Sequence, residues 1–282
     1  TVIASLLIAG SQSWLSQADR FLELPLGVFG VALGTVILPS LSRHHVATDK
    51  DGFSRALDWG LRTTLLIAVP AMFALMILSV PLVATIFQHG RFTAFDTKMA
   101  SLSISALSFG LPAFALVKVV LPAFYARKDT KTPVRAGVAS LVANMVFNVA
   151  FLAVLLFLWA TPAQKAGSWL DAIATIPGLH MALGMASALA SYLNLLLLWR
   201  WLGKAGVYTR QPGWSRHLVR LGVACAAMVA VLVGGLAIWP DWSDVEKWER
   251  VGRLAVLVGA GGGTYVVALF AMGFRLRELR AR

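Results

Sequence analysis

The chain has 282 residues, of which 58% are hydrophobic and only 13% charged, about half the charged fraction of ordinary soluble domains. Its formal net charge is +12 at pH 7, yet the basic residues lie in short segments between apolar runs and form no nucleic-acid-binding motif. The composition therefore excludes an ordinary soluble domain, and the charge pattern is typical of membrane topology rather than of nucleic-acid binding. The single cysteine, Cys225, excludes an intramolecular disulfide.

The apolar runs predict an all-α polytopic transmembrane bundle. The first run, 2–9, starts at the beginning of the chain without a signal-peptide pattern, and we expect it to be the end of a helix whose beginning is missing. Seven complete spans are predicted after this partial helix, with cores at 21–41, 65–87, 99–126, 134–159, 176–199, 218–239 and 254–273. Each is long enough to cross a hydrocarbon core of about 30 Å. Each should be a helix because a backbone in lipid must satisfy its own hydrogen bonds.

The distribution of Lys and Arg predicts the orientation of the spans. If seven helices alternate, one side carries 17 of these residues and the other carries seven. The richer set is Arg43, Lys50, Arg55, Arg62, Arg127, Lys128, Lys131, Arg135, Arg200, Lys204, Arg210, Arg216, Arg220, Arg275, Arg277, Arg280 and Arg282. The poorer set is Arg20, Arg91, Lys98, Lys165, Lys247, Arg250 and Arg253. Basic loops stay inside, so the richer side, with the C-terminus, is predicted to be cytoplasmic.

Two further patterns belong to the spans. The tryptophans fall near predicted span ends, as interfacial belts require: Trp14, Trp159, Trp169, Trp239, Trp242 and Trp248 near the outer edge, and Trp59, Trp199, Trp201 and Trp214 near the inner edge. The pairs Gly30/Gly34 and Gly259/Gly263 have the spacing that permits close helix packing.

A charged cluster lies where the first complete span enters from the outer side. Asp19, Arg20 and Glu23 share one face of a helix, because residues three and four apart are neighbours there. Two interpretations fit them. One is an interfacial salt bridge with Asp19 near a helix N-terminus. The other is an arginine held by carboxylates in a polar cavity, where it would grip a diphosphate bidentately; Ser13 would then line the cavity mouth.

Lys118 is the one Lys or Arg deep within a predicted span. A charge there is costly and faces a cavity or a partner, and we favour a structural partner such as a helix-end carbonyl over a substrate contact. Asn144 and Asn148, four apart on one face, predict interhelical hydrogen bonding. No zinc-ligand spacing, phosphate-binding loop or nucleophile–base pair is evident, so the sequence predicts neither an enzyme nor a cofactor or metal site.

Five segments resemble the MurJ/MviN family of lipid II flippases, in order along nearly the whole chain. They are ADRFLELPLGVFGVALGTVILPSLSR at 18–43, DWGLR at 58–62, FQHGRFTAFD at 87–96, FYARKDTKTPV at 124–134 and QPGW at 211–214. The resemblance implies the fold of the multidrug/oligosaccharidyl-lipid/polysaccharide exporter superfamily, with two six-helix lobes around a cavity and two extra helices. Residues 1–201 would form the second lobe, from a partial seventh to the twelfth helix. Residues 202–282 would form the extra helices and a basic cytoplasmic tail.

The resemblance also implies a function. Family members move lipid II, the undecaprenyl-diphosphate-linked peptidoglycan precursor, from the inner to the outer leaflet of the bacterial inner membrane by alternating access. The family's cavity arginine matches Arg20, its acidic neighbours match Asp19 and Glu23, and a serine matches Ser13; Lys118 completes the candidate substrate-binding set. The expected partners are lipid II, membrane lipid and the missing N-terminal lobe with its own arginines, and no nucleic acid.

Three alternatives stay open. A drug/cation antiporter of the same superfamily should place acidic residues deep within spans, and none is clearly there. An exporter of another polysaccharide-linked lipid would use similar chemistry. A non-transporting membrane scaffold would have no need for Arg20.

Overall fold

The computed structural model describes residues 2–162, 164 and 168–275, without the side chains of residues 2, 3, 28–35 and 170. Within this part the regular structure is entirely helical. The helices are α1 (Val2–Leu6), α2 (Ser11–Val46), α3 (Lys50–Ile77), α4 (Ser79–Ile86), α5 (Ala94–Ser108), α6 (Leu111–Tyr125), α7 (Lys131–Trp159), α9 (Trp169–Thr175), α10 (Met181–Lys204), α11 (Trp214–Ile238) and α12 (Lys247–Ala271). The predicted all-α class is confirmed.

The predicted spans correspond to these helices, with two differences. The 65–87 span is divided between α3 and α4 at Leu78, and the 99–126 span is divided between α5 and α6 at 109–110. Six segments of the described chain, with Ala94–Tyr125 counted as one, are long and apolar enough to cross a membrane. The remaining predicted span, 21–41, lies on α2, which has 36 residues and includes the segment without described side chains, so the number of spans stays a prediction.

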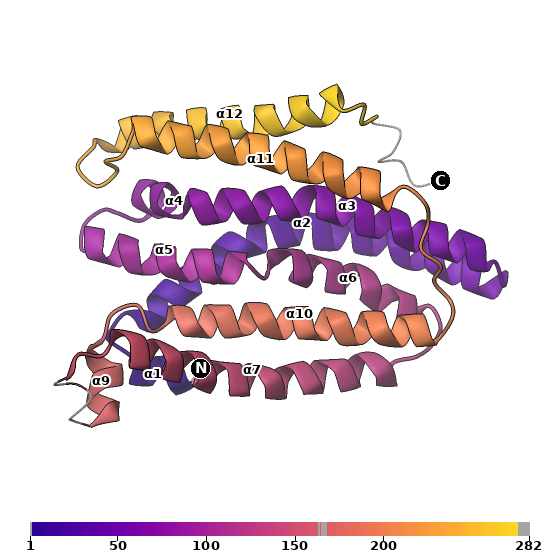
Figure 1. Ribbon diagram of the computed structural model, residues 1–282, viewed down its shortest axis with the longest axis horizontal. Helices are drawn as coiled ribbons and strands as arrows, with labels where there is room; N and C mark the ends of the chain where they lie inside the picture. Colours follow the sequence, from indigo (N-terminus) through magenta and orange to yellow (C-terminus); the bar gives the residue numbers. More distant parts are fainter. Residues whose placement is uncertain (1, 163, 165–167, 276–282) are drawn as a thin grey trace.

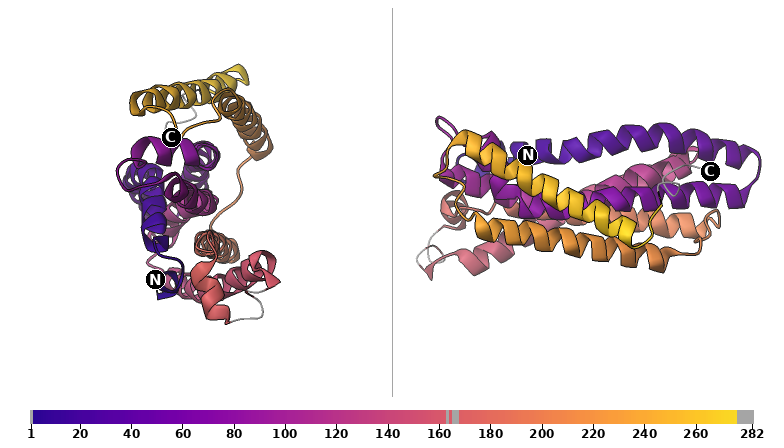
Figure 2. Two further views of the ribbon diagram at one scale, coloured as in Figure 1. Left: turned by 90° about the vertical axis from the view of Figure 1, so that its left-hand side faces the viewer. Right: turned by 90° about the horizontal axis from the view of Figure 1, so that it is seen from above.

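The helices form three layers (Figure 2). The middle layer holds α2 to α6, the α11–α12 hairpin covers one side of it, and α7 and α10 cover the other. The hairpin packs on α3 and α4, while α7 packs mainly on α10. None of the most apolar stretch of α7 is buried, so this helix presents an almost fully apolar surface outward.

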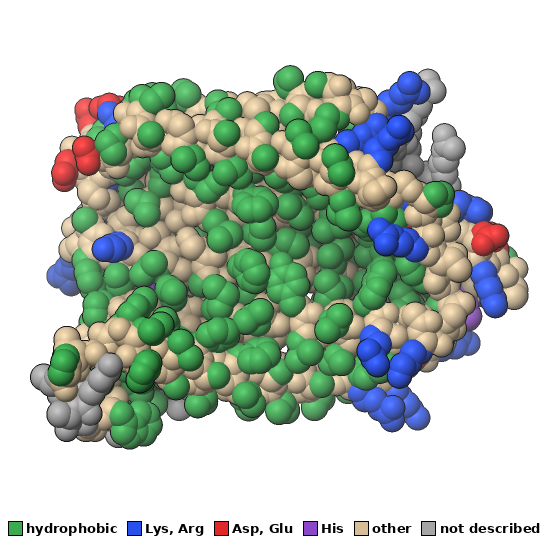
Figure 3. All heavy atoms as spheres, viewed as in Figure 1, with side chains coloured by type: hydrophobic (Ala, Val, Ile, Leu, Met, Phe, Trp, Pro, Cys, Tyr) green, Lys and Arg blue, Asp and Glu red, His purple; other side chains and the backbone are tan. Residues whose placement is uncertain are grey.

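The loops predicted to be basic lie together in space. The α2–α3, α6–α7 and α10–α11 connections and the end of α12 all lie at one end of the bundle (Figure 1), and Figure 3 shows blue Lys and Arg side chains gathered there. The alternation assumed in the charge count is therefore confirmed for the described chain. Lys165, Arg277, Arg280 and Arg282 lie outside the described residues, and the cytoplasmic assignment of this end stays a prediction.

The expectation about close helix packing at the glycine pairs needs correction. The glycine pair Gly259/Gly263 does not make the close helix contact, because a Cβ built on either residue meets nothing within 4 Å. The α11–α12 approach instead uses Gly235 and Gly261, where an added Cβ would collide with Leu257 and Leu232. Gly30 and Gly34 lie in the segment without described side chains.

The tryptophans at the predicted outer edge are not all interfacial. Trp14 is only 2% exposed and Trp242 only 4%. Trp14 packs against His180, with ring centroids 5.0 Å apart, and its Nε1 donates a hydrogen bond to Asp96 Oδ1 across 3.1 Å. These two indoles therefore pack inside the bundle, unlike the strongly exposed Trp169 and Trp248.

Candidate functional site

The first half of α2 has one buried and one open face. Trp14, Ala18, Phe21 and Leu22 are all less than 7% exposed and pack inside the bundle. A second set of residues in the same segment points the other way: Ser13, Ser16, Asp19, Arg20 and Glu23 are all exposed. The helical repeat of 3.6 residues sorts the two sets onto opposite sides. We call the second set the open face of α2.

The start of α2 is fixed by local geometry. Gly10 precedes the helix with φ of 98°, a left-handed conformation that favours glycine, and an added Cβ would lie 2.8 Å from the Trp14 ring. The Asp96 carboxylate that accepts from Trp14 also caps α5, because Asp96 Oδ2 accepts from Thr93 N across 2.9 Å. The first turn of α2 is thereby held against the start of α5, which sets the direction of the open face.

The structure brings four predicted site residues onto the open face: Ser13, Asp19, Arg20 and Glu23. Among the described residues, Arg20 forms no ion pair with Asp19 or Glu23. The prediction that Asp19, Arg20 and Glu23 share one face is confirmed. The structure does not show Arg20 paired with either carboxylate. The guanidinium keeps its donors available to a ligand.

Lys118 lies beside the open face rather than on it. It is an exposed residue of α6, and its Nζ donates a hydrogen bond to the carbonyl oxygen of Leu26 on α2 across 3.3 Å. The partner is a backbone carbonyl, as expected, but it lies within α2 rather than at a helix end. Leu26 follows Arg20 by six residues, about 9 Å along the helix axis, so α2 and α6 place both cations along one surface.

The predicted interhelical hydrogen bonding is confirmed for Asn144, whereas Asn148 bonds to Asn144 within α7. Asn144 Nδ2 donates to Ser187 Oγ on α10 across 3.3 Å, and Asn148 Nδ2 donates to Asn144 Oδ1 across 2.6 Å. The described residues contain no group of three or more His, Cys, Asp or Glu side chains arranged to hold a metal ion.

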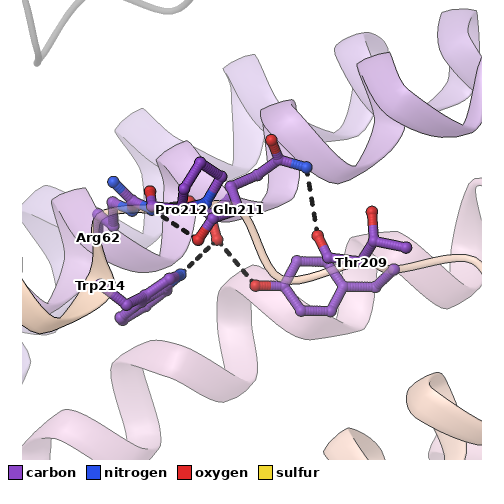
Figure 4. A network of polar contacts seen from close by, with 7 residues as sticks. Arg62, Thr209, Gln211, Pro212 and Trp214 are labelled. Carbon is purple, nitrogen blue, oxygen red and sulfur yellow. Dashed lines mark hydrogen bonds and ion pairs between the residues drawn. The ribbon is translucent and has the colours of Figure 1, made fainter.

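A polar network centred on Asp58 was missed by the sequence analysis. Asp58 lies on α3, is only 3% exposed, and forms an ion pair with Arg62 one turn later, with Oδ2 and Nε 2.7 Å apart. Its Oδ1 accepts hydrogen bonds from Tyr208 Oη across 2.8 Å and from Trp214 Nε1 across 2.6 Å. Figure 4 shows Arg62 of α3 and Trp214 of α11 beside Gln211 and Pro212 of the α10–α11 loop.

The same network holds the backbone of the α10–α11 loop. Arg62 Nη2 donates to the Pro212 carbonyl across 2.8 Å, and the Arg62 guanidinium lies 5.2 Å from the Trp214 ring centroid. Burial, with the hydrogen bond to Asp58, raises the pKa of the Tyr208 phenol well above its ordinary value. Tyr208 therefore stays a neutral donor to the Asp58 carboxylate. The signal in the sequence was an acid and a base four residues apart, directly before the apolar run that starts at Leu65.

Two further contacts attach the α11–α12 hairpin to the bundle. Tyr265 Oη on α12 donates to the Leu66 carbonyl on α3 across 2.5 Å. Arg250 Nη1 at the start of α12 donates to the Ala84 carbonyl on α4 across 3.0 Å, and its Nη2 donates to the Ser243 carbonyl across 2.7 Å. Together with the Asp58 network, these contacts attach the hairpin near both ends and in the middle.

The geometry agrees with the comparisons with known proteins. A family model described as lipid II flippase MurJ matches residues 1–250. The chain belongs to the MurJ family. A relative named probable lipid II flippase MurJ, from Vibrio cholerae, is 39% identical over 281 residues, which cover 99% of this chain and 49% of the relative. The lipid II flippase MurJ of Burkholderia cenocepacia is 35% identical and is matched over 100% of this chain and 50% of its own length.

The chain thus spans about half the length of the curated MurJ relatives it matches. A solved structure titled "Lipid II flippase MurJ, inward closed conformation" matches with a TM-score of 0.67 over 94% of this chain and 48% of that chain, at 23% identity. At that identity the likeness shows the fold. Membership of the MurJ family therefore rests on the sequence match, and the fold of the described half agrees with it.

Proposed function

We propose that this chain supplies one half of a flippase that moves lipid II, the undecaprenyl-diphosphate-linked precursor of peptidoglycan, from the inner to the outer leaflet of the bacterial inner membrane. The observation that carries the proposal is the MurJ family match over residues 1–250. The other half of the transport cavity would come from the missing N-terminal lobe, consistent with relatives about twice as long. We assign residues 1–201 to the second lobe and residues 202–282 to the extra helices and tail.

The open face of α2 supplies the chemistry that a diphosphate needs. Moving two negative charges through hydrocarbon is prohibitive, so the head group must cross a hydrated path beside fixed cations. Arg20 presents a planar fork of donors that fits phosphate oxygens bidentately, and Lys118 adds a point charge farther along the same surface. Asp19 and Glu23 would orient Arg20 and compete with the ligand, which favours release. The polyprenyl tail would stay in lipid throughout.

The antiporter alternative finds no support in the described chain. The buried acid within a span-length helix that the sequence analysis missed, Asp58, is already paired with Arg62 and hydrogen-bonded to Tyr208 and Trp214. A carboxylate with these three partners has little capacity left for a transported cation.

The proposal is tested in the full-length protein by depletion–rescue and by a lipid II flipping assay. We expect Arg20→Ala and Arg20→Glu to lower flipping by about tenfold or more, as the loss of charge-assisted hydrogen bonds implies. Arg20→Lys should retain part of the activity, because it keeps the charge and loses the fork. Normal flipping by both Arg20→Ala and Arg20→Glu would show that Arg20 is not a substrate contact.

The matched control is Arg91→Ala. Arg91 is an exposed arginine in the α4–α5 connection and is not one of the candidate substrate-binding residues, so its replacement should leave flipping unchanged. If both arginine variants lose activity equally, the effect reflects surface charge rather than a contact made by Arg20.

A further inference from the structure

A small pocket opens at the basic end of the bundle, where the end of α6, the start of α7 and the end of α10 meet. Its volume is about 290 Å³, and its lining residues are Phe124, Arg127, Asp129, Thr132, Arg135, Trp201 and Ala205. We call it the α6–α7 pocket. It lies on the opposite side of the middle layer from the α11–α12 hairpin (Figure 1), and it shares no residue with the open face of α2.

One arginine of the pocket has an unsatisfied donor. Arg127 Nη1 is buried and has no hydrogen-bond partner among the described residues. A buried donor of a charged group is costly to leave unpaired, so it calls for an acceptor. Arg135 adds a second guanidinium at the exposed rim of the same pocket. Two guanidinium groups around one small space are the arrangement that binds phosphate oxygens.

The one acid that lines the pocket offsets only part of its positive charge, because Asp129 interacts electrostatically with Arg127 while Arg135 lines the same space. Asp129 Oδ1 accepts a hydrogen bond from the Thr132 backbone N–H across 3.0 Å, which ties the carboxylate to the first turn of α7. Lys128 and Lys131 are exposed beside it. The segment from 124 to 135 therefore carries four basic residues and one acidic residue, and its surroundings attract an anion.

The neighbouring surface indicates where the anion comes from. The first turns of α7 continue from the pocket rim into exposed apolar side chains, including Val134 at 63% and Val138 at 57% exposure. Trp201 and Phe124 line the pocket itself. A head group seated between the arginines would leave its acyl chains along this apolar face. Basic pockets beside such helices bind anionic head groups.

We propose that the α6–α7 pocket binds the phosphate group of an anionic membrane phospholipid through Arg127 and Arg135. The site does not depend on the proposed lipid II transport. It requires only that the basic end of the bundle lies at a membrane surface. Figure 3 shows the Lys and Arg side chains gathered at that end.

The test measures protection of the pocket in the full-length protein. Ala205→Cys places a thiol on the exposed lining, in a Cys225→Ala background, with any cysteine outside this chain also removed. Phosphatidylglycerol, added to the protein in neutral detergent, should slow labelling by a water-soluble thiol reagent, whereas phosphatidylcholine should do so weakly. Arg127→Gln combined with Arg135→Gln should raise the half-protecting lipid concentration about tenfold or more.

Matched variants keep the test decisive. Arg135→Gln alone removes an exposed side chain, leaves folding undisturbed, and should still weaken protection. Arg43→Gln combined with Lys50→Gln removes two exposed charges from the end of α2 and the start of α3, at the same end of the bundle, and should change protection little. Equal loss in both double variants, or unchanged protection in the Arg135→Gln variant, overturns the proposal. Equal protection by millimolar inorganic phosphate would overturn the lipid source and leave a phosphate site.

Discussion

The Trp214 indole donates its N–H to the Asp58 carboxylate across 2.6 Å, although the two residues are 156 positions apart in the chain. This bond joins the first turn of α11 to α3, and the Arg62 and Tyr208 side chains share the same carboxylate. The α11–α12 hairpin is therefore attached to the bundle through a buried anion and not through apolar packing alone.

Removing this anion should destabilise the fold. Asp58→Ala leaves the Arg62 charge and the Tyr208 and Trp214 donors without their acceptor. We expect the free energy of unfolding to fall by ~3 kcal/mol, the low end of the range for a broken buried pair, because Arg62 is partly exposed. Thermal unfolding of the full-length protein in detergent measures the change. Asp51→Asn, at an exposed position in the first turn of the same helix, is the control and should change stability little.

The break between α5 and α6 is tightly packed against α10. A Cβ added at Gly110 would lie 2.8 Å from the Ala188 Cα, a backbone atom that cannot move aside. Gly110→Ala should therefore lower the free energy of unfolding by about 1–3 kcal/mol, the cost of overpacking. Gly137→Ala on α7, where an added Cβ meets nothing within 4 Å, should raise it by about 0.5–1 kcal/mol. Equal effects in thermal unfolding would contradict the close α5–α6 approach to α10.

The α6–α7 loop should respond to acid. Hydrogen bonds from Thr132 hold the pKa of the Asp129 carboxyl below its ordinary value. A depressed folded-state pKa stabilises the protein fully above the unfolded-state pKa of about 3.9, and this contribution is lost as the pH falls through the folded-state value. Asp129→Asn should lower the melting temperature at pH 7, and the difference from the parent protein should shrink as the pH falls below about 4. A difference that is constant with pH would show that the charge of Asp129 is not involved.

The orientation of the bundle can be tested by labelling. Thr130→Cys lies in the α6–α7 loop at the basic end, and Thr161→Cys follows α7 at the other end; both positions are exposed. The positive-inside rule predicts that an impermeant thiol reagent applied to intact spheroplasts labels Thr161→Cys and reaches Thr130→Cys only after permeabilisation. The reverse pattern would invert the predicted topology.

The sequence predicted the helical class and the side-to-side alternation, because span length and loop charge are local properties. It missed the break between α3 and α4 at Leu78 and the break between α5 and α6 at 109–110. The apolar runs continue across both breaks, so hydropathy alone does not reveal them. It selected Gly259 and Gly263 from their spacing, but which face of α12 meets α11 depends on tertiary packing, and that face carries Gly261.

Part of the candidate site could likewise be predicted from the sequence, and part could not. Arg20 and Lys118 stand out in the sequence because a charge beside or within an apolar span is costly and requires a reason. Asp58 did not stand out, since the segment from 42 to 62 was assigned to a loop, whereas α3 already begins at Lys50. Its partners Tyr208 and Trp214 are about 150 residues away, a pairing that only the folded chain reveals.

The three attachments of the α11–α12 hairpin have a mechanical consequence. Trp214 connects to Asp58 at one end, Tyr265 to Leu66 along the middle, and Arg250 to Ala84 at the other end. Contacts spread along the whole length of a hairpin resist both sliding and pivoting. In a conformational change of the bundle, α3, α4 and the hairpin should therefore move as one rigid body. The hinges of the molecule must then lie in other segments.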